Sequence, residues 1–166
     1  MIINGKRLLS AAPYRWHCSL DHRLRDSRDC ITGHQMRTAA LVQELCAYIG
    51  HPLHDSDLPR WALVHDEAER LTGDVPASAK QRWRYLAEAL DRAESEARRE
   101  LGIADPALTP EEWRIMKLCD RLDAYLWAKR LNCTDTAEWQ ADLVRLHKMA
   151  WAISGDAAEW LAGKVI

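Results

Sequence analysis

The stretch QMRTAALVQELCAYI, residues 35–49, has the pattern of one amphipathic helix. Its apolar side chains recur at steps of three and four residues, which is the spacing of one helix face. These side chains are Met36, Ala39, Ala40, Val42, Cys46 and Ile49. Gly50, His51 and Pro52 follow directly and are expected to end the helix, since glycine and proline both break helices. The stretch therefore predicts a helix over residues 35–49.

Helical periodicity continues after this stretch. A second helix is predicted to begin at Asp57 as its cap and to run to about Leu71, followed by a loop over residues 72–76. A long charged helix is predicted from Ala77 to Leu101, and one or two more helices over residues 135–161. The side chains of the charged helix expected to face the core are Trp83, Leu86, Ala87 and Leu90.

The clearest helix start lies at Thr109. Thr109 can cap the helix, Pro110 suits its first position, and Glu112 can complete a capping box. The side chains expected on the buried face of this helix are Trp113, Met116, Cys119, Leu122 and Leu126. Because no alternating strand pattern or long repeat is present, the sequence predicts an all-α protein of about six to seven helices, folded as a single domain over residues 1–166.

The composition narrows the class of protein. With 48% hydrophobic residues in 166, the chain is expected to be globular, and no run is long enough to span a membrane. The formal net charge of −2 gives no general attraction to nucleic acid or to anionic membranes. The N-terminus makes a poor signal peptide, and the five cysteines lack a CxxC pair, so we expect reduced core thiols in a cytoplasmic protein.

The residues that suggest chemistry lie in the stretch WALVHDEAERLTGDVP, residues 61–76. On a helix, His65, Asp66 and Glu69 would lie within about 100° of one another around the axis. An imidazole beside a carboxylate suits a divalent cation, and a third carboxylate one turn on could act on water. Alone, this pattern is more often a solvated polar face. His34 and Asp120 strengthen it, because Asp120 lies in an apolar stretch where a buried carboxylate needs a cation.

Three pieces of the sequence together resemble the HD-domain phosphohydrolase superfamily: Gly33-His34, Leu63-Val64-His65-Asp66, and residues 117–124 around Asp120. The run YRWH at residues 14–17 and the run ERLTGDVPASAK at residues 69–80 resemble its bacterial 5′-deoxynucleotidase branch. Compact phage dATP triphosphohydrolases resemble the same branch. The chain departs from the usual Glu-His-Ser around the first histidine, because it has Gly33-His34-Gln35.

The resemblance implies a single HD domain and a role for each matching residue. One divalent metal ion, Co²⁺, Mn²⁺, Zn²⁺ or Mg²⁺, would be held by His34, His65, Asp66 and Asp120. Glu69 would be the catalytic carboxylate that orients or deprotonates the attacking water, and Asp74 a second catalytic acid near the sugar or leaving oxygen. The residues expected to contact the substrate are Arg15 at phosphate, Trp16 at the sugar, Pro76 at the base and Lys80 at phosphate.

The function we favour from this resemblance is hydrolysis of 2′-deoxynucleoside 5′-monophosphates to deoxynucleoside and phosphate. One alternative is a dNTP triphosphohydrolase, in particular one for dATP that edits a phage nucleotide pool. A non-catalytic nucleotide-binding HD protein is an alternative of another class, although Glu69 speaks against it. Relatives of this kind lead us to expect a homo-oligomer, a dimer or larger, in the cytoplasm of a bacterium or of a phage host.

Two polar features have no role that the sequence assigns. Asp123 shares a helix face with Asp120 and could either support the metal ligands or face solvent. The charge signs alternate over residues 88–100, which is typical of a solvated helix face.

Overall fold

In a computed structural model, Leu24 and residues 29–75 and 77–166 are described, and they fold into helices joined by turns and loops. The prediction of an all-α protein is confirmed. The helices of this part of the chain are α3 (Ile31–Ile49), α4 (Leu58–Ala62), α5 (Glu69–Thr72), α6 (Ala77–Arg82), α7 (Arg84–Glu100), α8 (Pro110–Arg130), α9 (Ala137–Trp151) and α10 (Gly155–Val165).

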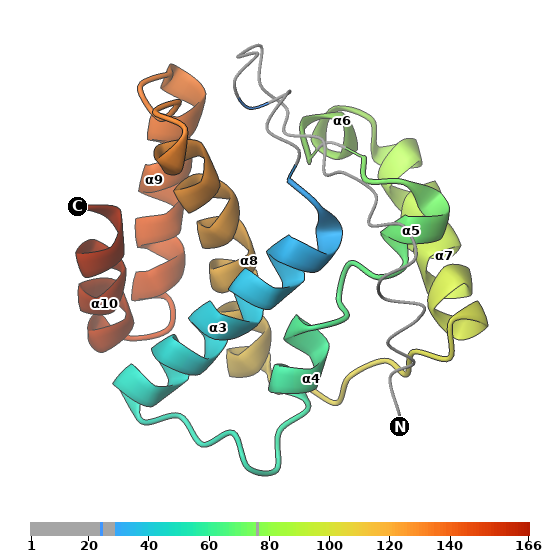
Figure 1. Cartoon of the computed structure of the whole chain (residues 1–166), viewed down its shortest axis with the longest axis horizontal. Helices are drawn as coiled ribbons and strands as arrows, with labels where there is room; N and C mark the ends of the chain where they lie inside the picture. The colour runs from blue at the N-terminus through green and yellow to red at the C-terminus, as the bar shows by residue number, and fades with distance from the viewer. Residues whose placement is uncertain (1–23, 25–28, 76) are drawn as a thin grey trace. The chain divides into compact units, whose positions relative to one another are not determined.

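The chain divides into two compact units. The first comprises the described residues up to Gln35 together with Val64–Asp105, and the second comprises Met36–Leu63 together with Pro106–Ile166. In the first unit, α7 packs against both α5 and α6 (Figure 1). In the second unit, α9 packs against both α8 and α10, and α4 packs against α8 (Figure 1). The prediction of a single domain over residues 1–166 stays a prediction.

The core of the second unit is built from long apolar side chains on its helices. The largest that are almost fully buried are Val42, Leu45, Leu58, Ile115, Leu118, Leu122, Leu146 and Leu161. Removing such surface from water is the main favourable term in folding, about 25 cal/mol for each Å² buried. On α3 the buried face is partly polar, since it includes Gln35 and Thr38, whereas Met36 is 63% exposed.

Helix α8 begins where the sequence predicts. The hydroxyl of Thr109 accepts a hydrogen bond from the Glu112 N–H at 3.2 Å, and the Glu112 carboxylate accepts one from the Thr109 N–H at 2.7 Å. Both N–H groups would otherwise lack an intrahelical partner. The prediction that Trp113 lies on the buried face of α8 is wrong, because its side chain is 37% exposed. Its ring meets the Trp61 ring edge-on, with 6.1 Å between the centroids.

The helix predicted from Asp57 to Leu71 is wrong in two respects. It breaks after α4, and residues 63–68 form turns before α5 begins at Glu69. Short backbone hydrogen bonds hold these turns, such as Glu67 N–H to the Val64 carbonyl at 3.0 Å. The Asp57 side chain does not cap α4, because Ser56 Oγ accepts the Leu58 N–H at 2.9 Å while Asp57 accepts the Ala107 N–H at 2.9 Å.

The helix predicted from Ala77 to Leu101 is also divided. Trp83 has an extended backbone, with φ −124° and ψ 93°, and separates α6 from α7. Its side chain is 45% exposed, so its predicted place in the core is wrong. Leu86, Ala87 and Leu90 are half-buried on the side of α7 that the pattern indicated.

Three of the four cysteines that the structure describes lie in the core. Cys46, Cys119 and Cys133 are buried free thiols, and Cys30 is a half-buried free thiol. Burial raises the pKa of the Cys46 thiol to about 11, which keeps it in its unreactive protonated form. None of the described helices is long and apolar enough to cross a membrane.

The cap at Thr109 gives a first test. Thr109→Ala removes the acceptor for the Glu112 N–H, and we expect it to lower the free energy of unfolding by about 1 kcal/mol. Urea or thermal unfolding measures this loss. Thr109→Ser keeps the hydroxyl and should stay close to wild type; an equal loss in both variants would contradict the capping role.

Candidate metal centre

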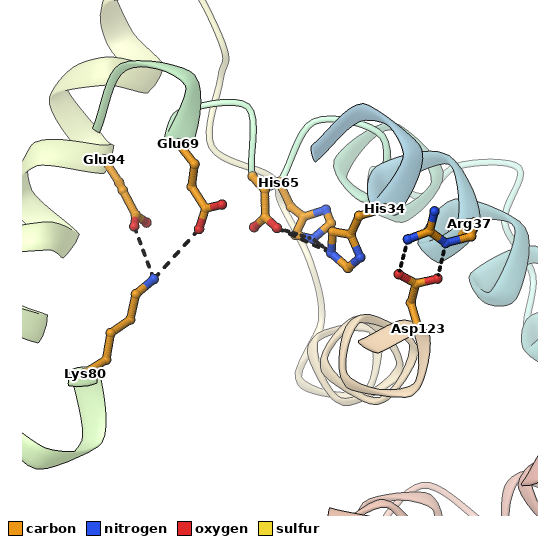
Figure 2. Close-up of polar contacts among 8 residues, drawn as sticks. His34, Arg37, His65, Glu69, Lys80, Glu94 and Asp123 are labelled. Atoms are coloured by element: carbon orange, nitrogen blue, oxygen red, sulfur yellow. Dashed lines mark hydrogen bonds and ion pairs between the residues drawn. The ribbon is translucent and has the colours of Figure 1, made fainter. Parts of the chain in front are cut away.

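His34 occupies the first turn of α3 and is fully buried. Its backbone N–H donates to the Cys30 carbonyl at 3.0 Å, which fixes the start of the helix. The turns of residues 63–68 present His65 and Asp66 to it, both half-buried. His65 and Asp66 therefore do not lie on the helix that the sequence predicted. They lie in turns, and both contact the side chain of His34 (Figure 2).

Three ligand-type atoms lie close together in this cluster. His34 Nε2 is 3.2 Å from His65 Nε2 and 3.3 Å from Asp66 Oδ2, and His65 Nε2 is 3.4 Å from the same oxygen. The imidazole rings meet edge-on, with centroids 5.1 Å apart. Two ring nitrogens that face each other and one carboxylate oxygen at such spacing resemble the edge of a coordination shell, where bonds of about 2.1 Å separate ligands by roughly 3 to 3.4 Å.

Asp120 lies on α8, in the second unit, and its predicted place among the metal ligands stays a prediction. Within the first unit, one ligand atom from each of His34, His65 and Asp66 can be chosen so that all three lie within 4.8 Å of one another. Two imidazoles and a carboxylate suit several first-row divalent ions. The cluster is therefore consistent with a divalent metal site, and the residues present fit such an ion.

Glu69 is the first residue of α5 and is only 6% exposed. Its pKa is raised to about 9, first by burial and then by the negative charges of Asp66, Asp74 and Glu94, whereas Lys80 lowers it. Its Oε2 has no hydrogen-bond partner in the part of the chain that the structure describes. A buried carboxylate with one oxygen left to accept a bond is suited to hold or deprotonate water.

Lys80 lies between two carboxylates. Its Nζ is 3.5 Å from Glu94 Oε1 on α7 and 3.8 Å from Glu69 Oε1 (Figure 2). Burial lowers the pKa of Lys80, but Glu94, Glu69 and the nearby aspartates raise it more, so the pKa is raised overall. The ammonium predicted to contact phosphate is thus bound to carboxylates in this structure.

The remaining predicted substrate contacts are only partly described. Asp74 is half-buried in the loop after α5, where its charge acts on Glu69. Arg15, Trp16 and Pro76 lie outside the described residues, so their predicted roles stay predictions.

Asp123 is buried and binds Arg37, so it does not face solvent. Arg37 Nε donates to one Asp123 oxygen at 2.7 Å and a second guanidinium nitrogen donates to the other at 3.0 Å (Figure 2). The guanidinium also lies 4.5 Å from the centre of the Trp127 ring. This pair joins α3 to α8 one turn beyond His34 and Asp120, and we did not predict it because 86 residues separate its members.

Two further features were missed. Gln35, at the departure from the usual Glu-His-Ser, is buried, and its Nε2 has no hydrogen-bond partner among the described residues. Glu94 falls in the run that we interpreted as a solvated face, yet its side chain is only 20% exposed. An alternating charge pattern cannot separate a glutamate that faces a half-buried lysine from those that face water.

The second unit contains a cavity of about 300 Å³. Its lining residues are Arg37, Ala40, Leu41, Glu44, Asp123, Leu126, Trp127 and Arg130. None of them is a predicted catalytic, metal-binding or substrate-binding residue, so this cavity does not mark the candidate site.

Comparison with known proteins identifies the family. The family model described as 5′-deoxynucleotidase YfbR-like matches residues 14–148. The chain belongs to this family. A dATP triphosphohydrolase of Cyanophage S-2L is 33% identical over 100 residues, which are 60% of this chain and 56% of that protein. The chain thus spans little more than half the length of this curated relative, and no solved structure gives a significant match.

Membership confirms the predicted resemblance and the HD-type helical fold. It places the chain in the family of HD phosphohydrolases. The match covers the cluster around His34 as well as Glu69 and Lys80.

The raised pKa of Glu69 gives a test on metal-free protein. Its carboxyl stays protonated in the folded chain up to about pH 9 but loses its proton near pH 4.5 when unfolded, so this group makes stability fall as pH rises between those values. Glu69→Gln mimics the protonated form. We expect it to match wild type near pH 5 and to exceed it by at least about 1 kcal/mol near pH 8.5.

Urea unfolding across this pH range, with chelator present, measures the difference. Parallel stability curves for the two proteins would contradict the buried, protonated state of Glu69.

Proposed function

We propose that this protein is a metal-dependent phosphohydrolase that converts 2′-deoxynucleoside 5′-monophosphates to deoxynucleoside and phosphate. The observation that carries the proposal concerns buried Glu69, three residues after the cluster residue Asp66: its Oε2 accepts no hydrogen bond from any residue that the structure describes. Membership of the 5′-deoxynucleotidase YfbR-like family supports the substrate class. A water molecule placed beside Glu69 would have a proton acceptor next to a cluster suited to a cation.

The residues proposed to hold one divalent ion are His34, His65, Asp66 and Asp120, and the close approach of the ligand atoms of the first three supports this. Such an ion would supply Lewis acidity toward water and phosphate and offset negative charge as phosphorus is attacked. Its charge beside Asp66 would also oppose the effect that raises the pKa of Glu69. Glu69 would then be ionised and able to act as a base near neutral pH.

In the proposed reaction, Glu69 takes a proton from the attacking water as the new P–O bond forms. The bond between phosphorus and the 5′ oxygen breaks, and the leaving oxygen takes up a proton. Asp74, near the sugar or leaving oxygen, is proposed to assist this step. Arg15 and Lys80 would neutralise phosphate charge, and Trp16 would pack against the deoxyribose.

A second candidate substrate is a deoxynucleoside triphosphate, which would lose its whole triphosphate. The similarity to the cyanophage dATP triphosphohydrolase favours this reading. Pro76 would then help to shape the pocket for adenine. The homo-oligomeric state and the cytoplasmic location stay predictions.

A product assay tests the proposal. Purified protein with added Co²⁺ is incubated with deoxynucleoside monophosphates, deoxynucleoside triphosphates and the matching ribonucleotides. We expect orthophosphate from the deoxynucleoside monophosphates. Intact triphosphate from dATP would instead establish the second candidate.

Glu69→Ala is expected to lower turnover at least about a hundredfold while the metal stays bound, because only the acid–base group is lost. Metal content measured on the same sample is the control. No turnover of any nucleotide by wild type with Co²⁺, Mn²⁺, Zn²⁺ or Mg²⁺ would contradict the enzyme proposal and favour a non-catalytic nucleotide-binding protein.

A further inference from the structure

Glu94 contacts Lys80, and it has no role in the reaction proposed above. It lies on α7 and accepts a hydrogen bond from Lys80 Nζ at 3.5 Å, while the same Nζ is 3.8 Å from Glu69 Oε1. Figure 2 shows the ammonium between the two carboxylates. Because α7 packs against both α5 and α6, three elements of one unit supply the three side chains.

The acidic groups that act on Lys80 outnumber its single positive charge. One ammonium faces Glu94 and Glu69 directly, and Asp74 and Asp66 act on it as well. A lysine surrounded by this much negative charge stays protonated although it is partly buried. Since the ammonium is shared, it neutralises Glu69 only in part.

The two oxygens of Glu69 have different surroundings. Oε1 is the one near Lys80, whereas Oε2 has no hydrogen-bond partner among the described residues. With Lys80 held partly by Glu94, the Lys80–Glu69 pair is loose: their separation of 3.8 Å exceeds the length of a charge-assisted hydrogen bond, about 2.7 to 2.9 Å.

We propose that Glu94 is a positioning residue of this site: it holds the Lys80 ammonium beside the Glu69 carboxylate without letting the two pair closely, so that Glu69 keeps its capacity to take a proton from water. This inference rests on the proposed function. Glu94 touches neither the cluster nor the unpartnered oxygen of Glu69 in any contact that the structure shows, and it acts through Lys80.

Neutralising Glu94 is expected to lower the pKa of Glu69. Lys80 would lose its nearer partner and pair with Glu69 alone, and the negative charge of Glu94 would no longer act on Glu69. Both changes stabilise ionised Glu69 and make it a weaker base. The step in which Glu69 takes a proton should slow, while substrate binding changes little.

The test is Glu94→Gln, compared with Glu96→Gln as a matched control. Glu96 is an exposed glutamate on the same helix, so the second variant makes the same change of charge and volume. With Co²⁺ present, we expect Glu94→Gln to lower kcat about tenfold near neutral pH, with KM within about twofold, and to move the acid limb of the pH profile to lower pH. Equal behaviour of the two variants, with active wild type, would overturn the inference.

A double-variant comparison tests the route through Lys80. Adding Glu94→Gln to Lys80→Met should lower kcat clearly less than the tenfold loss expected of Glu94→Gln alone, because only the direct effect of the Glu94 charge on Glu69 is then left. A further tenfold loss would overturn the inference. If Glu94→Gln does not fold, Glu94→Asp replaces it: the charge is kept, so the acid limb should stay at its wild-type pH, and a shifted limb would again overturn the inference.

The experiment distinguishes failure of the proposed function from failure of the proposed role of Glu94. Wild-type protein that turns over no nucleotide removes the reaction and this inference with it, whereas active wild type with an unaffected Glu94→Gln variant removes the inference alone.

Discussion

The cluster around His34 depends on one constraint: three polar atoms, two from imidazoles and one from a carboxylate, lie 3.2 to 3.4 Å apart at a largely buried position. His34 is fully buried, so this arrangement is costly unless its atoms share protons or a cation. The local fold accommodates the constraint. Residues 63–68 have a composition that favours a helix, yet they form turns, and these turns present His65 and Asp66 to His34.

Charge balance around Glu69 follows from the same crowding. Burial is the largest cause of the raised pKa of Glu69, three other carboxylates raise it further, and the Lys80 ammonium lowers it. The carboxyl is therefore neutral in the metal-free protein. The proposed contact of Lys80 with phosphate would therefore compete with its contacts to the Glu94 and Glu69 carboxylates. Glu94 determines how that single charge is shared.

Much of the fold could be predicted from the sequence because its signals are local. The capping box at Thr109 specifies the start of α8 within four residues, and the structure confirms it. The breaks after α4 and at Trp83 could not be predicted, since both segments have helical composition throughout. Among the site residues, motif resemblance grouped His34 with His65, whereas the Arg37–Asp123 and Lys80–Glu94 contacts depend on packing between distant segments.

His34, His65, Asp66 and Asp120 are proposed to bind one divalent ion together. Anomalous diffraction from crystals grown with Co²⁺, recorded on both sides of the cobalt absorption edge, tests this metal site. We expect one strong peak within bonding distance, about 2.1 Å, of a ligand atom from each of the four residues. A folded protein that takes up Co²⁺ elsewhere, or that shows no peak at this cluster, would contradict it.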